Sequence, residues 1–122
     1  MSDQAKFWDK TAAKYAAMPI RNADAYAATL EQVRGLGQPS NAVLELGCGT
    51  GSTTIALAPH FESIVATDLS SEMIKIGCQK ADDAKLSNVR FAQTGIADAP
   101  SRPFDMILAF NLLHLLQIWT GL

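Results

Sequence analysis

Short apolar runs and amphipathic stretches alternate along most of this chain. Residues 3–17 carry apolar side chains at helical spacing, and Tyr26, Leu30 and Val33 repeat that spacing in a second helical segment. From residue 42 onward the pattern predicts strand 42–46, helix 52–58, strand 63–68, helix 71–84, strand 89–93, strand 104–110 and helix 112–119. The chain therefore divides into an N-terminal helical segment over 1–40 and a second part over 41–122.

The alternation of strands and helices in the second part predicts an α/β fold with a mostly parallel sheet. Right-handed crossovers place the first strand at the centre of that sheet. In helix 71–84, Ser70 is the predicted N-cap and Glu72 is an acidic residue favourably placed in the first turn. The expected buried stripe of this helix consists of Met73, Gly77, Cys78 and Ala81.

The loop after the first strand has glycine at every second position, at Gly47, Gly49 and Gly51. Glycine tolerates positive φ and lets the main chain approach a ligand closely. The helix that follows offers unpaired N–H groups to an anionic group. Ser52 stands where the dinucleotide fingerprint needs glycine, and no lysine follows Gly51 as in a triphosphate loop. The pattern predicts a nucleotide-like cofactor site; the alternative is a tight turn without a ligand.

Asp68 ends the second apolar strand. It follows Gly49 by 68 − 49 = 19 positions, close to the ~20 expected for a ribose-binding carboxylate in a βαβ unit. A carboxylate can accept hydrogen bonds from both hydroxyls of a ribose. We therefore expect Asp68 to hold the ribose of the cofactor, the alternative being a solvated carboxylate at a strand end.

Composition narrows the function further. The 122 residues are 48% hydrophobic with a formal net charge of −2, which favours one folded domain over a disordered chain. No basic block alternates with aromatic residues, and no apolar run approaches a membrane span. We expect a cytoplasmic protein that binds neither nucleic acid nor membrane. Cys48 and Cys78 form no metal-like spacing with His60 or His114, so we expect two reduced thiols and no metal.

Several ordered motifs carry a family resemblance. They are VLELGCGTG at 43–51, DLSSEMI at 68–74, FDMI at 104–107 and NLLH at 111–114, preceded by FWDK at 7–10 and AKY at 13–15. Together they resemble the class I S-adenosylmethionine-dependent methyltransferases, especially small-molecule members similar to quinone-biosynthesis methyltransferases. The resemblance implies a Rossmann-like domain with strand order 3-2-1-4 and helices on both faces. It also implies S-adenosyl-L-methionine as cofactor and a small-molecule methyl acceptor.

The resemblance also implies a set of cofactor-binding residues. They are Tyr15, Glu45, Gly47, Gly49, Gly51, Asp68, Leu69, Met73, Gly95, Ile96 and Phe110. No catalytic residue is assigned, because a sulfonium leaving group is already activated and transfer needs mainly orientation. Asn111 joins Phe110 near the expected sulfonium position. His114 is the candidate general base near that edge, but on its apolar helix we expect it to pack or cap.

Some of these roles leave alternatives. Glu45 either anchors the loop backbone or helps to hold the methionine amino group. Leu69 and Met73 form either an apolar shelf beneath ribose and adenine or ordinary core. The family usually has an acidic residue where Gly95 falls, so adenine is read either by Asp98 after a small shift or by the backbone of Gly95 and Ile96. Tyr15 lies either over the methionine end or half-buried on its helix.

Four strands are predicted here, whereas the family's sheet continues beyond the fourth. We expect either the N-terminal part of an enzyme or a chain that completes itself with a copy, as a homodimer through strand 104–110 and helix 112–119. Two alternative functions are a non-catalytic cofactor-binding or oligomerising fragment of the same fold and a dinucleotide-dependent oxidoreductase. The latter is disfavoured by Ser52.

Overall fold

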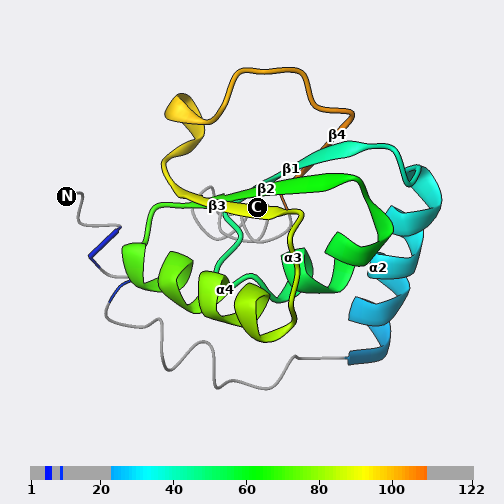
Figure 1. Ribbon diagram of the computed structural model, residues 1–122, viewed down its shortest axis with the longest axis horizontal. Coiled ribbons are helices and arrows are strands. Elements are labelled where there is room, and N and C mark those ends of the chain that lie inside the picture. The colour runs from blue at the N-terminus through cyan, green and yellow to red at the C-terminus, as the bar shows by residue number, and fades with distance from the viewer. Residues whose placement is uncertain (1–4, 7–8, 10–22, 110–122) are drawn as a thin grey trace, which may run out of the picture.

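The computed structural model describes residues 5–6, 9 and 23–109 of the chain. Its centre is a four-stranded, fully parallel sheet in the order β3-β2-β1-β4. The strands are β1 (Ala42–Leu46), β2 (Ser63–Asp68), β3 (Val89–Gln93) and β4 (Met106–Leu108). The predicted order 3-2-1-4, with the first strand inside the sheet, is confirmed (Figure 1).

The first three strands have the predicted bounds, but the fourth is shorter than predicted. β4 begins at Met106, two residues after the expected start. The reason lies at Asp105, whose backbone N–H donates to the carbonyl of Ala42 at 2.8 Å while its Oδ2 accepts the Ala42 N–H at 2.7 Å. A side chain thus takes the place of one strand-to-strand bond. Phe110, at the far end of the prediction, lies outside the described residues.

Three helices lie on one face of the sheet (Figure 1). They are α2 (Ala23–Leu36), α3 (Ser52–Leu57) and α4 (Ser71–Asp83). α3 ends one residue earlier than predicted, and the chain continues as the short 3-10 helix η1 (Ala58–His60), which has a proline at its start. The helices predicted over 3–17 and 112–119 fall largely or wholly outside the described residues, so helices on the second face stay a prediction.

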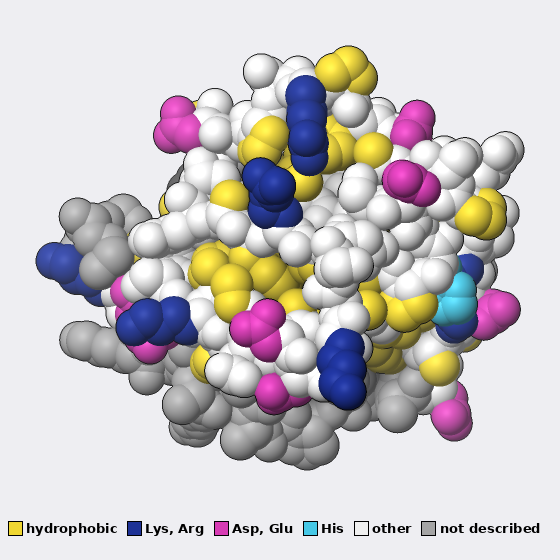
Figure 2. All heavy atoms as spheres, viewed as in Figure 1, with side chains coloured by type: hydrophobic (Ala, Val, Ile, Leu, Met, Phe, Trp, Pro, Cys, Tyr) yellow, Lys and Arg dark blue, Asp and Glu magenta, His cyan; other side chains and the backbone are white. Residues whose placement is uncertain are grey.

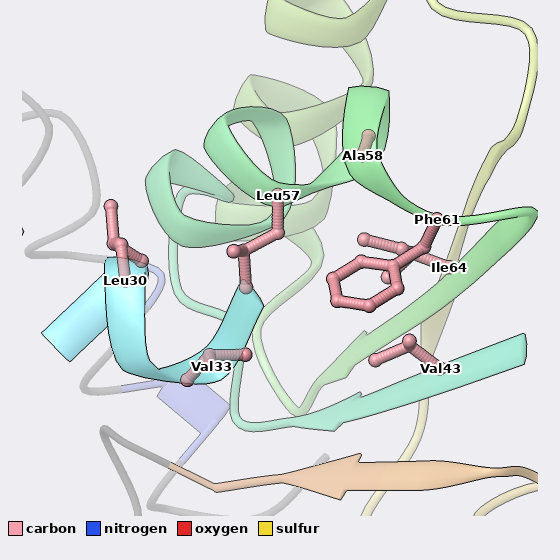
Figure 3. Close-up of a cluster of buried hydrophobic side chains, with 7 residues drawn as sticks. All are labelled: Leu30, Val33, Val43, Leu57, Ala58, Phe61 and Ile64. Atoms are coloured by element: carbon pink, nitrogen blue, oxygen red, sulfur yellow. The ribbon is translucent and has the colours of Figure 1, made fainter. Parts of the chain in front are cut away.

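A cluster of buried apolar side chains joins α2, α3 and η1 to this face of the sheet. Figure 3 shows these side chains gathered between α2, α3 and η1 and the strands β1 and β2. The cluster consists of Leu30, Val33, Val43, Leu57, Ala58, Phe61 and Ile64. Burial of an aliphatic side chain of this size stabilises a fold by ~1.5–3 kcal/mol. The cluster therefore fixes the position of α3, and with it the loop between β1 and α3.

α4 packs on the same face through a line of small and flexible residues. Met73, Gly77 and Ala81 are buried, as predicted from their four-residue spacing. A Cβ built on Gly77 would lie 2.6 Å from the ring of Phe91 on β3, so glycine allows the helix to approach the sheet closely. The prediction for Cys78 is wrong: its side chain is exposed, because it lies ~100° around the helix from Gly77.

Within the described part of the chain, no helix is both long and apolar enough to cross a lipid bilayer. The connection from β3 to β4 contains the 3-10 helix η2 (Ile96–Asp98) and lies on the side of the sheet away from α3 and α4 (Figure 1).

Candidate functional site

The loop between β1 and α3 adopts the backbone conformation that its glycines predict. Gly47, Gly49 and Gly51 have φ values of 65°, 58° and 84°, all in the left-handed region. Residues with a Cβ are strained there by about 1–2 kcal/mol each. The Cys48 N–H donates to the carbonyl of Thr67 on β2 at 2.8 Å, which fastens the loop to the end of the neighbouring strand. The main chain of the loop is thus curled at the carboxyl edge of the sheet.

Asp68 lies directly beside this loop. Its Oδ2 accepts the backbone N–H of Gly49 at 2.9 Å, and its Oδ1 accepts the backbone N–H of Ser70 at 3.0 Å. Each oxygen has two lone pairs, so beside these bonds from described residues both retain capacity for one more donor. The structure therefore brings together two of the predicted site residues across 19 positions and leaves acceptor capacity on the carboxylate.

Glu45 is buried beneath the loop, with 3% of its surface exposed. Its Oε1 accepts a hydrogen bond from the Thr54 hydroxyl on α3. Burial raises its pKa from an ordinary 4.5 to about 7; the Thr54 bond opposes this shift, and the nearby charge of Asp68 adds to it. The contact with Thr54 joins β1 to α3, and anchoring of the loop backbone by Glu45 stays a prediction. Contact with a methionine amino group stays a prediction.

Hydroxyl side chains around the start of α3 connect it to two other helices. Lys80 on α4 donates to the Thr50 hydroxyl at 3.0 Å and to the Ser52 hydroxyl at 3.1 Å. Tyr26 on α2 shares a hydrogen bond with Thr53. Partial burial lowers the pKa of Lys80.

Sequence reasoning missed these partners. Their signal was weak: Lys80 follows Gly77 by three positions, which places it beside the buried stripe of the helix.

Cys48, inside the loop, is a free and buried thiol whose pKa is raised by burial and by the charges of Glu45 and Asp68. A neutral thiol of this kind is chemically inert, in line with the predicted structural role.

On the other side of Asp68, β2 and β3 end side by side. The Thr94 N–H donates to the carbonyl of Asp68 at 3.0 Å, and a Cβ on Gly95 would lie 3.3 Å from Leu69 Cδ2. Leu69 and Gly95, both predicted to surround the nucleoside, are therefore neighbours. Ile96 follows at the start of η2 with 60% of its surface exposed.

The remaining predicted residues are either buried, exposed or outside the described part of the chain. Met73 is only 2% exposed, so it packs in the core. Asp98, the alternative adenine acceptor, is exposed in η2. Tyr15, Phe110, Asn111 and His114 lie outside the described residues.

Comparison with known proteins identifies the family. Residues 43–120, which include both the glycine loop and Asp68, match the family described as methyltransferase domain. The chain belongs to this family. Its methyltransferase domain thus contains β1, β2, β3 and β4 together with α3 and α4.

Relatives agree with this assignment. The methyltransferase domain is similar to an uncharacterized methyltransferase, YcgJ, of Bacillus subtilis, with 34% identity over 75 residues, or 59% of this chain and 29% of that protein. It is also similar to the demethylmenaquinone methyltransferase of Porphyromonas gingivalis, with 36% identity over 87 residues, or 66% of this chain and 36% of that protein. The chain therefore spans about a third of the length of these curated relatives.

A solved structure has the same architecture. The complex of DhpI with SAH superposes with a TM-score of 0.70 at 33% identity, over 87% of this chain and 50% of the other. The parallel sheet and its helices thus have the arrangement found in that complex, and the match extends beyond the glycine loop alone.

Proposed function

We propose that this chain is the cofactor-binding part of an S-adenosyl-L-methionine-dependent methyltransferase that acts on a small-molecule acceptor. The observation that carries the proposal is the Asp68 carboxylate, which is bonded to the Gly49 N–H and has lone pairs left for a ribose. Membership of the methyltransferase-domain family supports it. DhpI, a structural relative at 30% identity, was solved with SAM and HEP bound.

In this proposal each part of the site takes one part of the cofactor. Asp68 accepts the ribose hydroxyls, and the left-handed main chain at Gly47 and Gly49 accommodates the methionine end. Leu69 supplies an apolar surface beside the nucleoside, and the backbone of Gly95 and Ile96 contacts adenine. Glu45 and Gly51 support the loop from within, Met73 packs in the core beneath the site, and Tyr15 and Phe110 complete the predicted cofactor-binding set.

The cofactor supplies an activated methyl group on a sulfonium. Transfer is an in-line displacement, so the contribution of the protein is to orient the two reactants and to exclude water. Orientation of this kind lowers a barrier by at most ~7–11 kcal/mol. The bond from the Gly49 N–H to Asp68 serves this purpose because it holds the loop, and the bond from Thr54 to Glu45 holds α3 against β1. A dedicated general base is not required, and we assign no catalytic residue.

Titration calorimetry with S-adenosyl-L-methionine tests the proposal. Asp68→Ala is expected to weaken binding at least tenfold, because each lost charge-assisted hydrogen bond is worth ~1.5–3 kcal/mol. Asp82→Ala, which removes an exposed carboxylate near the end of α4, is the matched control and should bind like the wild type. Unchanged affinity in a folded Asp68→Ala variant would refute the assignment. Thermal-shift assays with NAD as a second ligand distinguish the oxidoreductase alternative.

The small-molecule acceptor and the cytoplasmic location belong to the same proposal. Charges of both signs are interspersed on the face shown in Figure 2, and the formal net charge is −2, which does not favour a nucleic-acid partner. Turnover with a panel of small quinols and phenols separates the enzyme from a non-catalytic cofactor-binding fragment. No turnover with any acceptor, despite cofactor binding, would favour the fragment.

We further propose homodimerisation through strand 104–110 and helix 112–119. β4 is an edge strand of the described sheet, and Ile107 on it is 61% exposed. An apolar edge strand of this kind is prone to pair with another chain. Light scattering at micromolar concentration should give the mass of a dimer, and a monomer would contradict the proposal.

A further inference from the structure

Asp9 binds the start of α4, although the two are more than 60 positions apart in the sequence. Its Oδ1 accepts from the Ser70 hydroxyl, from the Glu72 backbone N–H at 3.1 Å and from the Ser71 hydroxyl at 3.5 Å. The hydrogen bonds from Ser70 and then Glu72 lower the pKa of Asp9, so its carboxylate is charged at neutral pH.

Ser70 connects this contact to the cofactor site. Its hydroxyl donates to Asp9 and accepts the Met73 N–H at 3.1 Å, while its own backbone N–H donates to Asp68 Oδ1 at 3.0 Å. The residue is fully buried, with 0% of its surface exposed. A continuous series of hydrogen bonds thus leads from Asp9 through Ser70 and Asp68 to the Gly49 N–H.

We propose that Asp9 is a positioning residue for the cofactor site and that its binding to α4 is coupled to binding of the cofactor. The inference rests on the proposed function and deepens it. Asp9 itself does not contact the ribose in this scheme. It fixes the Ser70 hydroxyl and the first turn of α4, and Ser70 in turn fixes one oxygen of Asp68. When the charge of Asp9 is removed, the buried Ser70 hydroxyl donates to a weaker acceptor. The Asp68 side chain is then less well oriented.

Coupling of this kind is reciprocal. If Asp9 bound to α4 favours the orientation of Asp68 that accepts a ribose, a bound cofactor must equally favour Asp9 on α4. A purely structural role as a helix cap predicts something different. Asp9 would then stabilise α4 through the helix dipole and the Glu72 N–H, with no effect on affinity for the cofactor.

The test compares Asp9→Asn with Asp24→Asn in the full chain. Asp24 is an exposed acid in the first turn of α2, so its substitution removes the same charge from the start of another helix, one that does not contact Asp68. Titration with S-adenosylhomocysteine should give a dissociation constant at least about fivefold higher for Asp9→Asn and unchanged for Asp24→Asn. Equal affinity of Asp9→Asn and wild type would overturn the inference.

Two further measurements separate positioning from capping. In a Ser70→Ala background, Asp9→Asn should weaken binding by less than twofold, because the connecting hydroxyl is already gone. Hydrogen exchange at the amides of Glu72 and Met73 should slow on addition of S-adenosylhomocysteine in the wild type and not in Asp9→Asn. Full additivity of the two substitutions, or equal slowing in both proteins, would contradict the coupling. Failure of the wild type to bind would instead refute the proposed function.

Discussion

Glu45 gives the sharpest test of how the buried part of the site works. The perturbation is Glu45→Gln, which keeps the shape of the side chain and an oxygen that can accept the Thr54 hydrogen bond. It removes only the ability to ionise. Because the carboxyl is 3% exposed, its charged form is poorly solvated in the folded protein, which is why its pKa is raised to about 7.

The magnitude follows from linkage between protonation and folding. The ordinary pKa is 4.5 and the folded value is about 7, a difference that corresponds to about 3 kcal/mol at ~1.36 kcal/mol per pKa unit. Between these values the unfolded chain has lost the proton and the folded chain keeps it. Stability contributed by the protonated Glu45 is thus fully present below pH 4.5 and is lost as pH rises through 7. From pH 5 to pH 8 the loss amounts to about 2.5 kcal/mol.

The assay is urea unfolding at pH 5 and at pH 8. Wild type should lose stability over this interval relative to Glu45→Gln, by about 2.5 kcal/mol, so that the variant becomes the more stable protein at pH 8. Glu62→Gln is the matched control, because the Glu62 side chain is already exposed to water, and its stability should follow that of wild type. Parallel pH dependence for wild type and Glu45→Gln would show that the carboxyl ionises without penalty in the folded protein and would refute the reasoning.

Two other predictions concern the scaffold and use thermal or urea unfolding. Leu57→Ala, which empties a position only 1% exposed, should lower the free energy of unfolding by about 2–5 kcal/mol, whereas Leu36→Ala, at 81% exposed, should change it by less than about 0.5. Gly51→Ala should cost at least about 1 kcal/mol, since φ is 84° and the new Cβ would meet Phe91 at 3.1 Å. Gly35→Ala, with open space around it in α2, should instead stabilise by up to about 1 kcal/mol. Stabilisation by Gly51→Ala would contradict the left-handed loop.

At the carboxyl edge of the sheet, the local sequence pattern predicted two features of the site. Strand ends in a parallel βαβ unit meet at one edge, so the approach of Asp68 to Gly49 follows from their positions after two successive strands. Left-handed backbone at the three loop glycines follows from the absence of a Cβ. Neither inference needs a long-range contact beyond the order of the elements, and the sequence sufficed for both.

Other contacts depend on which side chains meet after folding. Asp9 and Lys80 both bind polar groups near the site, yet each is more than 25 positions from its partner. Nothing in the spacing of polar residues selects those partners among many of the same type. The start of β4 is a similar case. The Asp105 side chain, one residue before this strand, accepts a hydrogen bond from the N–H of Ala42, which lies 63 positions earlier.

By itself, the sequence determined the parallel α/β sheet with its first strand inside and the cofactor-type loop, because periodic burial and glycine chemistry are local properties of the chain. The full strand order 3-2-1-4 was implied by the family resemblance, and the structure confirms it. Tertiary structure decided that Cys78 is exposed and that Glu45 lies against Thr54 with a raised pKa. Those outcomes depend on which surfaces exclude water once the helices cover the sheet. Burial and its electrostatic cost arise only in the folded chain, and no stretch of residues carries them alone.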